Sequence, residues 1–397
     1  MKFSAICTLG LLAPLPCAML FAADRAAAQE PPPDVWQWSV DANVFVGLNY
    51  QHRRFINIRE VKREVESQNW LMTMASRSAG RGTLTFRSAF SFEPFTMRAV
   101  GSPQLLQTGE TFKNRRLIDY QHPHDLFMAL GSEYRWPVDD WMVRAGVYLV
   151  GDPSIGPPVF MHRPSAAENP QATLGHHNVD ATHITHGVVK AGVERGIVGF
   201  EVSWFQGREP DEDRIGLDLG APDSWAARLS WTIGPWAAQV SSALLHEPER
   251  LEPGDVTRHT ASVGYTRTSG DRSSAIFVAW GQNREVFGVF DAYVAEATIR
   301  PSAKNAFYGR AEVVDKSIIG GGTHIPGVVH RHPESRVGAV TVGYVRDLVV
   351  GRYGRWGLGA DVTRYRIPEN LKFLYGSPRS YHVFLRYRPE RSMSGQM

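Results

Sequence analysis

Residues 36–50 read WQWSVDANVFVGLNY, and this stretch decides the fold. Its even positions are apolar, and most of its odd positions are polar. Successive side chains of a β-strand point to opposite faces, so a period of two predicts a strand with one apolar and one polar face. Globular strands usually have about 5–6 residues, and a stretch of this length suits a tilted strand that crosses a bilayer. Trp36, Trp38 and Tyr50 mark the two ends of the apolar face, as in the aromatic girdles of membrane strands.

The same alternation recurs along the chain and predicts 16 strands, with 14 or 18 as alternatives. In the second of these segments, Trp70 and Met72 are assigned to the lipid-facing side. The remaining segments are 84–92, 126–136, 141–149, 189–193, 198–204, 225–231, 236–240, 261–265, 276–280, 293–299, 307–313, 340–344, 356–362 and 381–387.

The links between these segments are short at one end and mostly long at the other. The longer links are 51–67, 94–124, 151–182, 208–223, 248–255, 283–289, 316–334 and 366–379. Short turns on one side and long loops on the other are typical of a transmembrane β-barrel, and closure removes the exposed strand edges. The prediction is therefore an all-β, antiparallel transmembrane barrel over 36–388; a soluble sandwich or propeller is the alternative and would have shorter strands.

The N-terminus reads as an export signal, because Lys2 precedes an apolar stretch that ends in three alanines, 26–28. We expect a signal peptide over 1–28, a short periplasmic segment over 29–35 and a periplasmic tail over 389–397. Both cysteines, Cys7 and Cys17, lie in the expected signal peptide, so the mature chain would have no disulfide. An even strand count places both ends on the side of the short turns.

Composition and motifs exclude several classes of protein. Outside the N-terminus no apolar run is long enough for a membrane helix. A net charge of +3 on 397 residues, without a block of Lys or Arg, gives no indication of nucleic-acid binding. No nucleophile elbow, HExxH motif, phosphate-binding loop or dinucleotide fingerprint is present. The prediction is a protein without catalytic residues, although a barrel hydrolase needs no such motif and stays open.

The sixteenfold alternation resembles the Gram-negative outer-membrane porin-type barrels. Two stretches, HRPSAAENP (162–170) and FQGREPDE (205–212), also resemble an uncharacterised family of predicted outer-membrane proteins. The first resemblance implies an outer-membrane location, lipid as the surroundings and passive diffusion of small polar solutes. A homo-oligomer stays open.

The polar parity of the strands would line the interior, because charges are costly in lipid. It carries more basic than acidic residues, which indicates a mild anion preference; a ladder of mutually paired charges is the alternative. The candidate pore-lining residues are Arg87, Glu133, Arg135, Arg144, Lys190, Glu194, Glu201, Arg228, Glu296, Arg310 and Glu312.

Histidines gather in or beside the long loops. Imidazole suits Zn²⁺ and Cu²⁺, but the spacing matches no defined zinc motif. No cofactor is therefore predicted, with Zn or Cu as the alternative, and a metal-binding protein that captures ions at its outer loops is the second function considered. The candidate ligands are His122, His124, His162, His176, His177 and His186; His183 belongs to the same group as His186, and His324, His330 and His332 form a third group.

The loop 151–182 is the third of the long connections. At this length it should have a packed structure or a function. In the porins that the chain resembles, the third loop folds inward and narrows the channel. We expect the same here, with pH- or metal-dependent conductance set by its histidines; an external lid or an oligomer contact is the alternative.

Overall fold

The computed structural model describes residues 34–54, 63–108, 111–180, 184–286, 288–316 and 335–389. The expected signal peptide, His183, His324, His330 and His332 lie outside these residues, as does nearly all of the expected C-terminal tail. Among the described residues, no helix has the length and apolarity needed to span a membrane.

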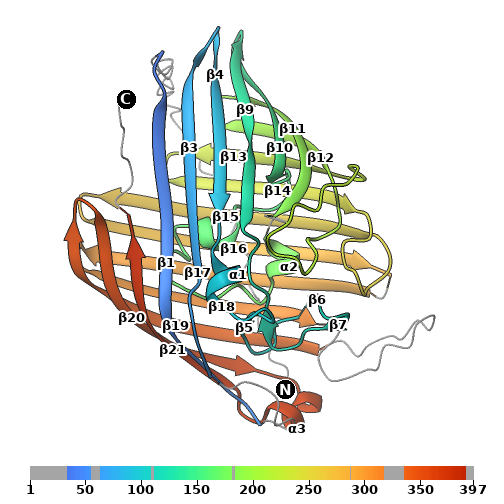
Figure 1. The fold of residues 1–397 in the computed structure, drawn as a ribbon, viewed down its shortest axis with the longest axis vertical. Helices are drawn as coiled ribbons and strands as arrows, with labels where there is room; N and C mark the ends of the chain where they lie inside the picture. The colour runs from blue at the N-terminus through green and yellow to red at the C-terminus, as the bar shows by residue number, and fades with distance from the viewer. Residues whose placement is uncertain are drawn as a thin grey trace, which may run out of the picture. The chain divides into compact units, whose positions relative to one another are not determined.

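The described chain forms one antiparallel barrel (Figure 1). Its strands are β1 (Gln37–His52), β2 (Arg63–Glu66), β3 (Asn69–Ala79), β4 (Gly82–Phe90), β9 (Phe127–Val138), β10 (Trp141–Gly151), β11 (Thr185–Arg195), β12 (Val198–Phe205), β13 (Ser224–Ile233), β14 (Trp236–Leu245), β15 (Val256–Ser269), β16 (Arg272–Glu285), β17 (Gly288–Ser302), β18 (Asn305–Lys316), β19 (Ser335–Gly351), β20 (Gly354–Arg366) and β21 (Arg379–Arg388).

Pairing of the first strand with the last closes the barrel. β1 pairs with β21 from Val44↔Tyr387 to His52↔Arg379. The short β2 continues the line of β3, and both pair with the other edge of β1, so the wall has sixteen strands. This confirms the predicted fold class and strand count. The expected link 283–289 is much shorter than predicted, because β16 and β17 extend to Glu285 and Gly288, which pair with each other.

The outer face of the barrel is an apolar band. Val202, Trp204, Val278 and Val342 are each about half exposed, and they occupy the alternate positions that the sequence assigns to lipid. In a bilayer a closed barrel satisfies every backbone group of the wall between strands. Toward the short-turn end, Trp236 packs on Tyr265 at 4.9 Å and Trp356 on Tyr387 at 4.7 Å between ring centroids. These pairs fit an interfacial aromatic girdle.

The lipid-facing assignment is wrong in β3. Trp70 lies opposite the inward-facing Asn43, and Met72 lies opposite Asp41, so both side chains point into the barrel. Trp70 is 6% exposed and its ring lies 4.4 Å from that of His162. Alternation cannot decide the outward face here, because the inside of the barrel holds a folded loop and offers its own apolar surface.

Neighbouring positions in β13 test which face meets lipid. Leu229 lies opposite the exposed Phe200 and Val240, so Leu229→Arg should cost about 2–4 kcal/mol of folding free energy near the midplane. Ser230 lines a cavity inside the barrel, so Ser230→Arg should cost less than about 1 kcal/mol. Reversible unfolding from lipid vesicles would measure both values. Equal losses for the two variants would contradict the assigned faces.

Candidate functional site

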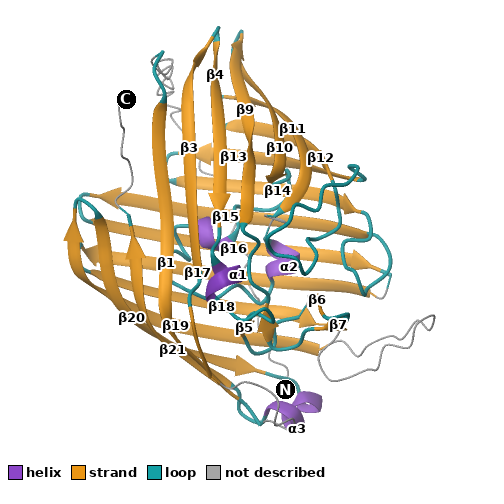
Figure 2. Ribbon diagram, in the orientation of Figure 1, coloured by secondary structure: helices purple, strands orange, loops and turns teal. Residues whose placement is uncertain are grey.

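The long loop between β10 and β11 folds into the barrel. It carries η1 (Phe160–His162) and α2 (His176–Val179), and most of its described residues are buried. In Figure 2, α2 lies among the loops inside the ring of strands, and it contacts β15, β16 and β17. The expectation of an inward-folding loop is therefore met, and the alternative of an external lid does not hold for the described part, 152–180.

Arg163 is the central attachment of this loop. Its guanidinium donates two hydrogen bonds to Glu296 of β17, each 2.9 Å long, and a further bond to Asp180 at the end of the loop. All three residues are at most 3% exposed. The Arg163 guanidinium also lies 4.5 Å from the ring centroid of Phe277. A bidentate pair of this kind fixes both the position and the orientation of the loop.

Glu168 ties the same loop to the opposite end of the sequence. Its carboxylate accepts hydrogen bonds from Arg300 of β17 and Arg388 of β21, the latter at 3.0 Å, and lies 3.4 Å from Arg386. Burial alone would raise the pKa of Glu168, but the three guanidinium groups outweigh it and lower the pKa to about 2. The carboxylate therefore stays charged throughout the neutral range.

The middle of the loop is bonded to the wall through its backbone. Arg310 donates to the carbonyls of Gln171 and Ala172 at 2.9–3.0 Å. The backbone N–H of Leu174 donates to Glu312 at 2.6 Å, and the Lys316 ammonium donates to the Leu174 carbonyl at 2.6 Å. Buried peptide groups need hydrogen-bond partners, and here charged residues of the barrel wall provide them and hold the loop in place.

A second loop, 91–126, covers the first from the long-loop end. Leu105 and Leu106 are buried against Leu174 in one apolar cluster. The side-chain amides of Gln104 and Gln107 donate to the carbonyls of Ala172 and Thr173 at 2.8 and 3.1 Å. Two loop layers therefore narrow this end of the barrel.

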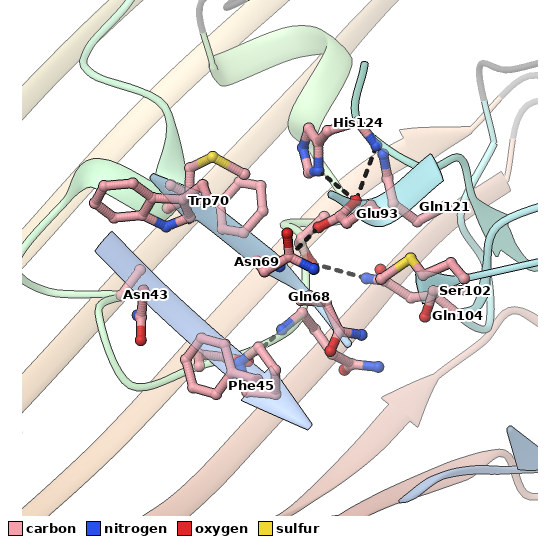
Figure 3. A pocket seen from close by; sticks show the side chains of 18 of the residues that line it. Asn43, Phe45, Gln68, Asn69, Trp70, Glu93, Ser102, Gln104, Gln121 and His124 are labelled. Atoms are coloured by element: carbon pink, nitrogen blue, oxygen red, sulfur yellow. Dashed lines mark hydrogen bonds and ion pairs between the residues drawn. The ribbon is translucent and has the colours of Figure 1, made fainter. Parts of the chain in front are cut away.

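A small cavity marks the seam between these loops and the strands β1 and β3 (Figure 3). The Glu93 carboxylate bonds with the backbone N–H and with Nδ1 of His124, both at 2.8 Å, and accepts from the backbone N–H of Asn69 at 3.3 Å. The cavity has a volume of 30 Å³, which holds about one water molecule. The cavity lies where the two loops contact the barrel wall, and it is too small to hold a solute.

Two larger cavities lie on the other side of the loop, toward the short turns. One of 510 Å³ is lined by Arg144, Arg163 and Arg228 together with Glu201. The other, of 340 Å³, has an excess of arginine. Its charged lining residues are Arg272, Arg300, Arg355, Arg386 and Arg388, with Glu168 and Asp271.

The predicted pore-lining residues all lie on the inward parity of their strands, in two groups. Around β9 to β13, Glu194 lies 2.8 Å from Arg135 and 3.0 Å from Arg144, and Glu201 lies 3.1 Å from Arg144 and 2.5 Å from Arg228. The second group, Glu296, Arg310 and Glu312, lies beneath the loop. Three more members complete the set: Arg87, paired with Asp152 at 2.5 Å, Glu133, which accepts from Tyr148, and Lys190, 5.6 Å from the Tyr148 ring.

The six candidate histidines are not brought into one metal centre. His124 and His176 are buried beside Glu93 and Asp180. His162 packs on Trp70, and His186 is buried at the start of β11. His122 bonds with the Pro123 carbonyl. Only His177 belongs to a described group of three possible metal ligands, together with Glu209 and Glu249.

Sequence reasoning missed several residues that matter here. Arg163, Glu168 and Glu209 stand in the two stretches that carry the resemblance, 162–170 and 205–212, but no spacing in the sequence marks them as site residues. Asp347, which pairs with Arg300 and Arg386, and Glu249 were not singled out. The sequence contains only a weak signal for these residues. A loop has no periodicity, so its sequence does not show whether a charged residue is buried in an ion pair or exposed to solvent.

Burial lowers the pKa of two histidines in the inward loop. It lowers the pKa of His162 to about 4 and also lowers that of His176. Both therefore stay uncharged at pH 7, and the expected charge switch near neutrality does not apply to these two. A His162 pKa below the ordinary 6.5 means that its contribution to the stability of the folded state is fully present above pH 6.5 and is lost as the pH falls toward 4.

Acid should therefore loosen the loop, and His162→Gln isolates one cause. The melting temperature of the wild-type barrel should fall between pH 6.5 and 4, and the variant should show a smaller fall over the same window because it has no imidazole to protonate. Below pH 4.5 the unfolded chain takes up a proton at Glu168 while the folded barrel does not until about pH 2, which should lower the stability of both proteins equally. Thermal unfolding in detergent across this range measures the effect. Identical pH profiles would show that His162 does not contribute.

Comparisons with known proteins agree at the level of the fold. No protein-family model and no curated protein matches the sequence, so the resemblance of 162–170 and 205–212 to an uncharacterised family stays an expectation. An outer membrane protein of Vibrio cholerae, OmpT with loop L8 deleted, superposes with a TM-score of 0.52 at 10% identity, covering 89% of this chain and all of that one. An anion-selective porin from Comamonas acidovorans gives 0.52 at 13% identity with the same coverage. The chain thus has the fold of the outer-membrane porin-type barrels: a closed, multi-pass, sixteen-stranded antiparallel barrel whose apolar band faces lipid.

Proposed function

We propose that the protein is an outer-membrane channel through which small polar solutes diffuse passively. The observation that carries this proposal is the charged, water-accessible interior beneath the inward loop, with cavities of 510 and 340 Å³. A sixteen-stranded barrel is wide enough for an aqueous channel unless something fills it. Here the described parts of two loops, 91–108 with 111–126 and 152–180, occupy part of the interior, so the conductance should be small.

A mild anion preference is the finer part of the proposal. Most wall charges are paired, which supports the paired-ladder alternative around β9 to β13. The arginines of the 510 Å³ cavity are matched by their carboxylate partners, but the 340 Å³ cavity keeps five arginines against three acids, Glu168 and Asp271 of its lining and Asp347, which pairs with three of the arginines. Unbalanced positive charge in a low-dielectric recess raises the local concentration of anions. The similar fold of an anion-selective porin is compatible with this preference.

No catalytic step is assigned. The most enzyme-like pair is Asp361 and His382, with 2.6 Å between the carboxylate and Nδ1. The other ring nitrogen, Nε2, lies 2.8 Å from Asn49 and 3.0 Å from Gln171. Neither amide is a nucleophile, and the group is buried against the loop, so its role is to hold Gln171 and the loop in place.

Planar-bilayer recording of the purified barrel tests the proposal. We expect discrete conductance steps and, in a KCl gradient, a reversal potential displaced toward that of chloride. The variant Arg272→Gln, at the rim of the 340 Å³ cavity, should reduce that displacement. A folded barrel without conductance would refute the channel, whereas a reversal potential displaced toward potassium would refute only the anion preference.

A further inference from the structure

Three loops bring a mixed set of metal ligands together at the long-loop end of the barrel. His177 comes from α2 of the inward loop, Glu209 from the loop after β12, and Glu249 from the loop after β14. Their ligand atoms all lie within 4.8 Å of one another. The side chains are 12–22% exposed, so the group is held by the protein and remains accessible to water.

The spacing of the three residues fits a small divalent cation. Nδ1 of His177 lies 3.1 Å from a carboxylate oxygen of Glu209 and 3.6 Å from one of Glu249. Zinc binds nitrogen and oxygen ligands at about 2.0–2.1 Å in a tetrahedral arrangement, which places neighbouring ligand atoms about 3.3 Å apart. The two distances from His177 differ from this spacing by only a few tenths of an ångström, and the two glutamates, whose ligand atoms lie within 4.8 Å of each other, can close on an ion by side-chain rotation.

Backbone contacts hold the ligands in position without an ion. The backbone N–H of Glu209 donates to the Pro248 carbonyl at 3.1 Å and joins the two outer loops next to the ligands. The amide of Asn283, on β16, donates to the His177 carbonyl at 3.1 Å. Such preorganisation reduces the ordering cost of binding.

The surrounding charge also favours a cation. The charged groups that line the adjoining 60 Å³ cavity beside His177 are four acidic side chains, Glu249, Glu252, Glu285 and Asp315, and two cations, Arg258 and Lys316. Two nearby arginines bond with other groups: Arg116 lies 3.6 Å from Glu252, and the buried Arg258 donates to Asn283. Carboxylates outnumber guanidinium groups here, and a bound divalent ion would reduce their mutual repulsion.

We propose that His177, Glu209 and Glu249 form a zinc-binding site at the outer mouth of the barrel. Two carboxylates and one imidazole with a water molecule in the fourth position form a donor set that zinc accepts. Binding replaces the proton on Nδ1 of His177, which passes to water. The ion would cross-link the inward loop to two outer loops and so hold the loop in place. This goes beyond passive diffusion and does not depend on it.

Zinc binding to the purified, tag-free full-length mature barrel in detergent tests the site. Competition with a zinc-sensitive dye should give one Zn²⁺ per chain, and X-ray absorption should show nitrogen and oxygen ligands including one imidazole. His177→Gln and Glu249→Gln should each weaken binding at least tenfold. The matched control is His246→Gln, an exposed histidine beside Asp255 on the same outer loop as Glu249, which should bind as the wild type does.

Two results would overturn the site. One is a wild-type barrel that binds no stoichiometric Zn²⁺; the other is unchanged affinity in both His177→Gln and Glu249→Gln. Heat-modifiable mobility on gels establishes that each variant is folded, and Glu209→Gln provides a third ligand variant if one of the others does not fold. No conductance measurement enters the test, so its outcome is independent of the channel proposal.

Discussion

Deleting residues 157–178 should raise the single-channel conductance about fivefold or more, because the bare lumen of a sixteen-stranded barrel is an open aqueous channel. The deleted segment includes Arg163, Glu168 and the first three residues of α2, all of which lie inside the barrel. The wall charges that it leaves, such as Glu296 and Arg310, would then face water and need no protein partner.

The control for this deletion removes 215–217, at the tip of the loop after β12, where Ile215 and Leu217 are exposed and the backbone N–H groups of Ile215 and Gly216 bond only to Asp213 of the same loop. That change should leave the conductance nearly as it is, since the segment lies outside the narrowed region. Planar-bilayer recording on refolded protein compares the three barrels. If the 157–178 deletion folds and conducts like the wild type, the loop does not limit the flow of ions.

The second large effect is expected for Arg163→Ala, which should cost about 3–5 kcal/mol of folding free energy because it leaves buried carboxylates without their partner. Asp180 and Glu296 are at most 3% exposed and share this guanidinium. The loop should loosen before the barrel unfolds, since the wall retains its own strand pairing.

Reversible urea unfolding in vesicles measures the global loss, and limited proteolysis within 152–180 measures the loosening. The matched control is Arg195→Ala, whose ion pair with Asp140 is exposed on both sides and should contribute less than about 1 kcal/mol. Equal losses in the two variants would show that the Arg163 pairs are not the attachment described above.

Much of the wall could be predicted from the sequence, because a period of two leaves a direct mark on every strand. β12 shows why: Val198, Phe200, Val202 and Trp204 are exposed in turn. The prediction failed at Trp70, where the interior is itself apolar. It also failed at the β16–β17 turn, where strand ends depend on pairing with neighbours and not on local pattern.

The candidate site was harder to predict, for a physical reason. Arg310 and Glu312 were recognised as inward-facing, but their partners are backbone groups of a loop more than 130 residues away in sequence. Residues that pair across such a long sequence separation show no characteristic spacing in the sequence. The metal ligands are similar: His177 was a candidate, yet Glu209 and Glu249 meet it only because three separate loops converge.

The attachments of the inward loop also constrain the order in which the protein can assemble. Ala167 accepts a hydrogen bond from Asn43 of β1, and its neighbour Glu168 bonds with Arg388 of β21. These are the first and last strands, which meet only when the sheet closes. The loop is made early in synthesis but cannot complete its bonds until the final strand arrives. It then joins β1 and β21 from inside the barrel, so separating these two strands also requires the hydrogen bonds of the loop to break.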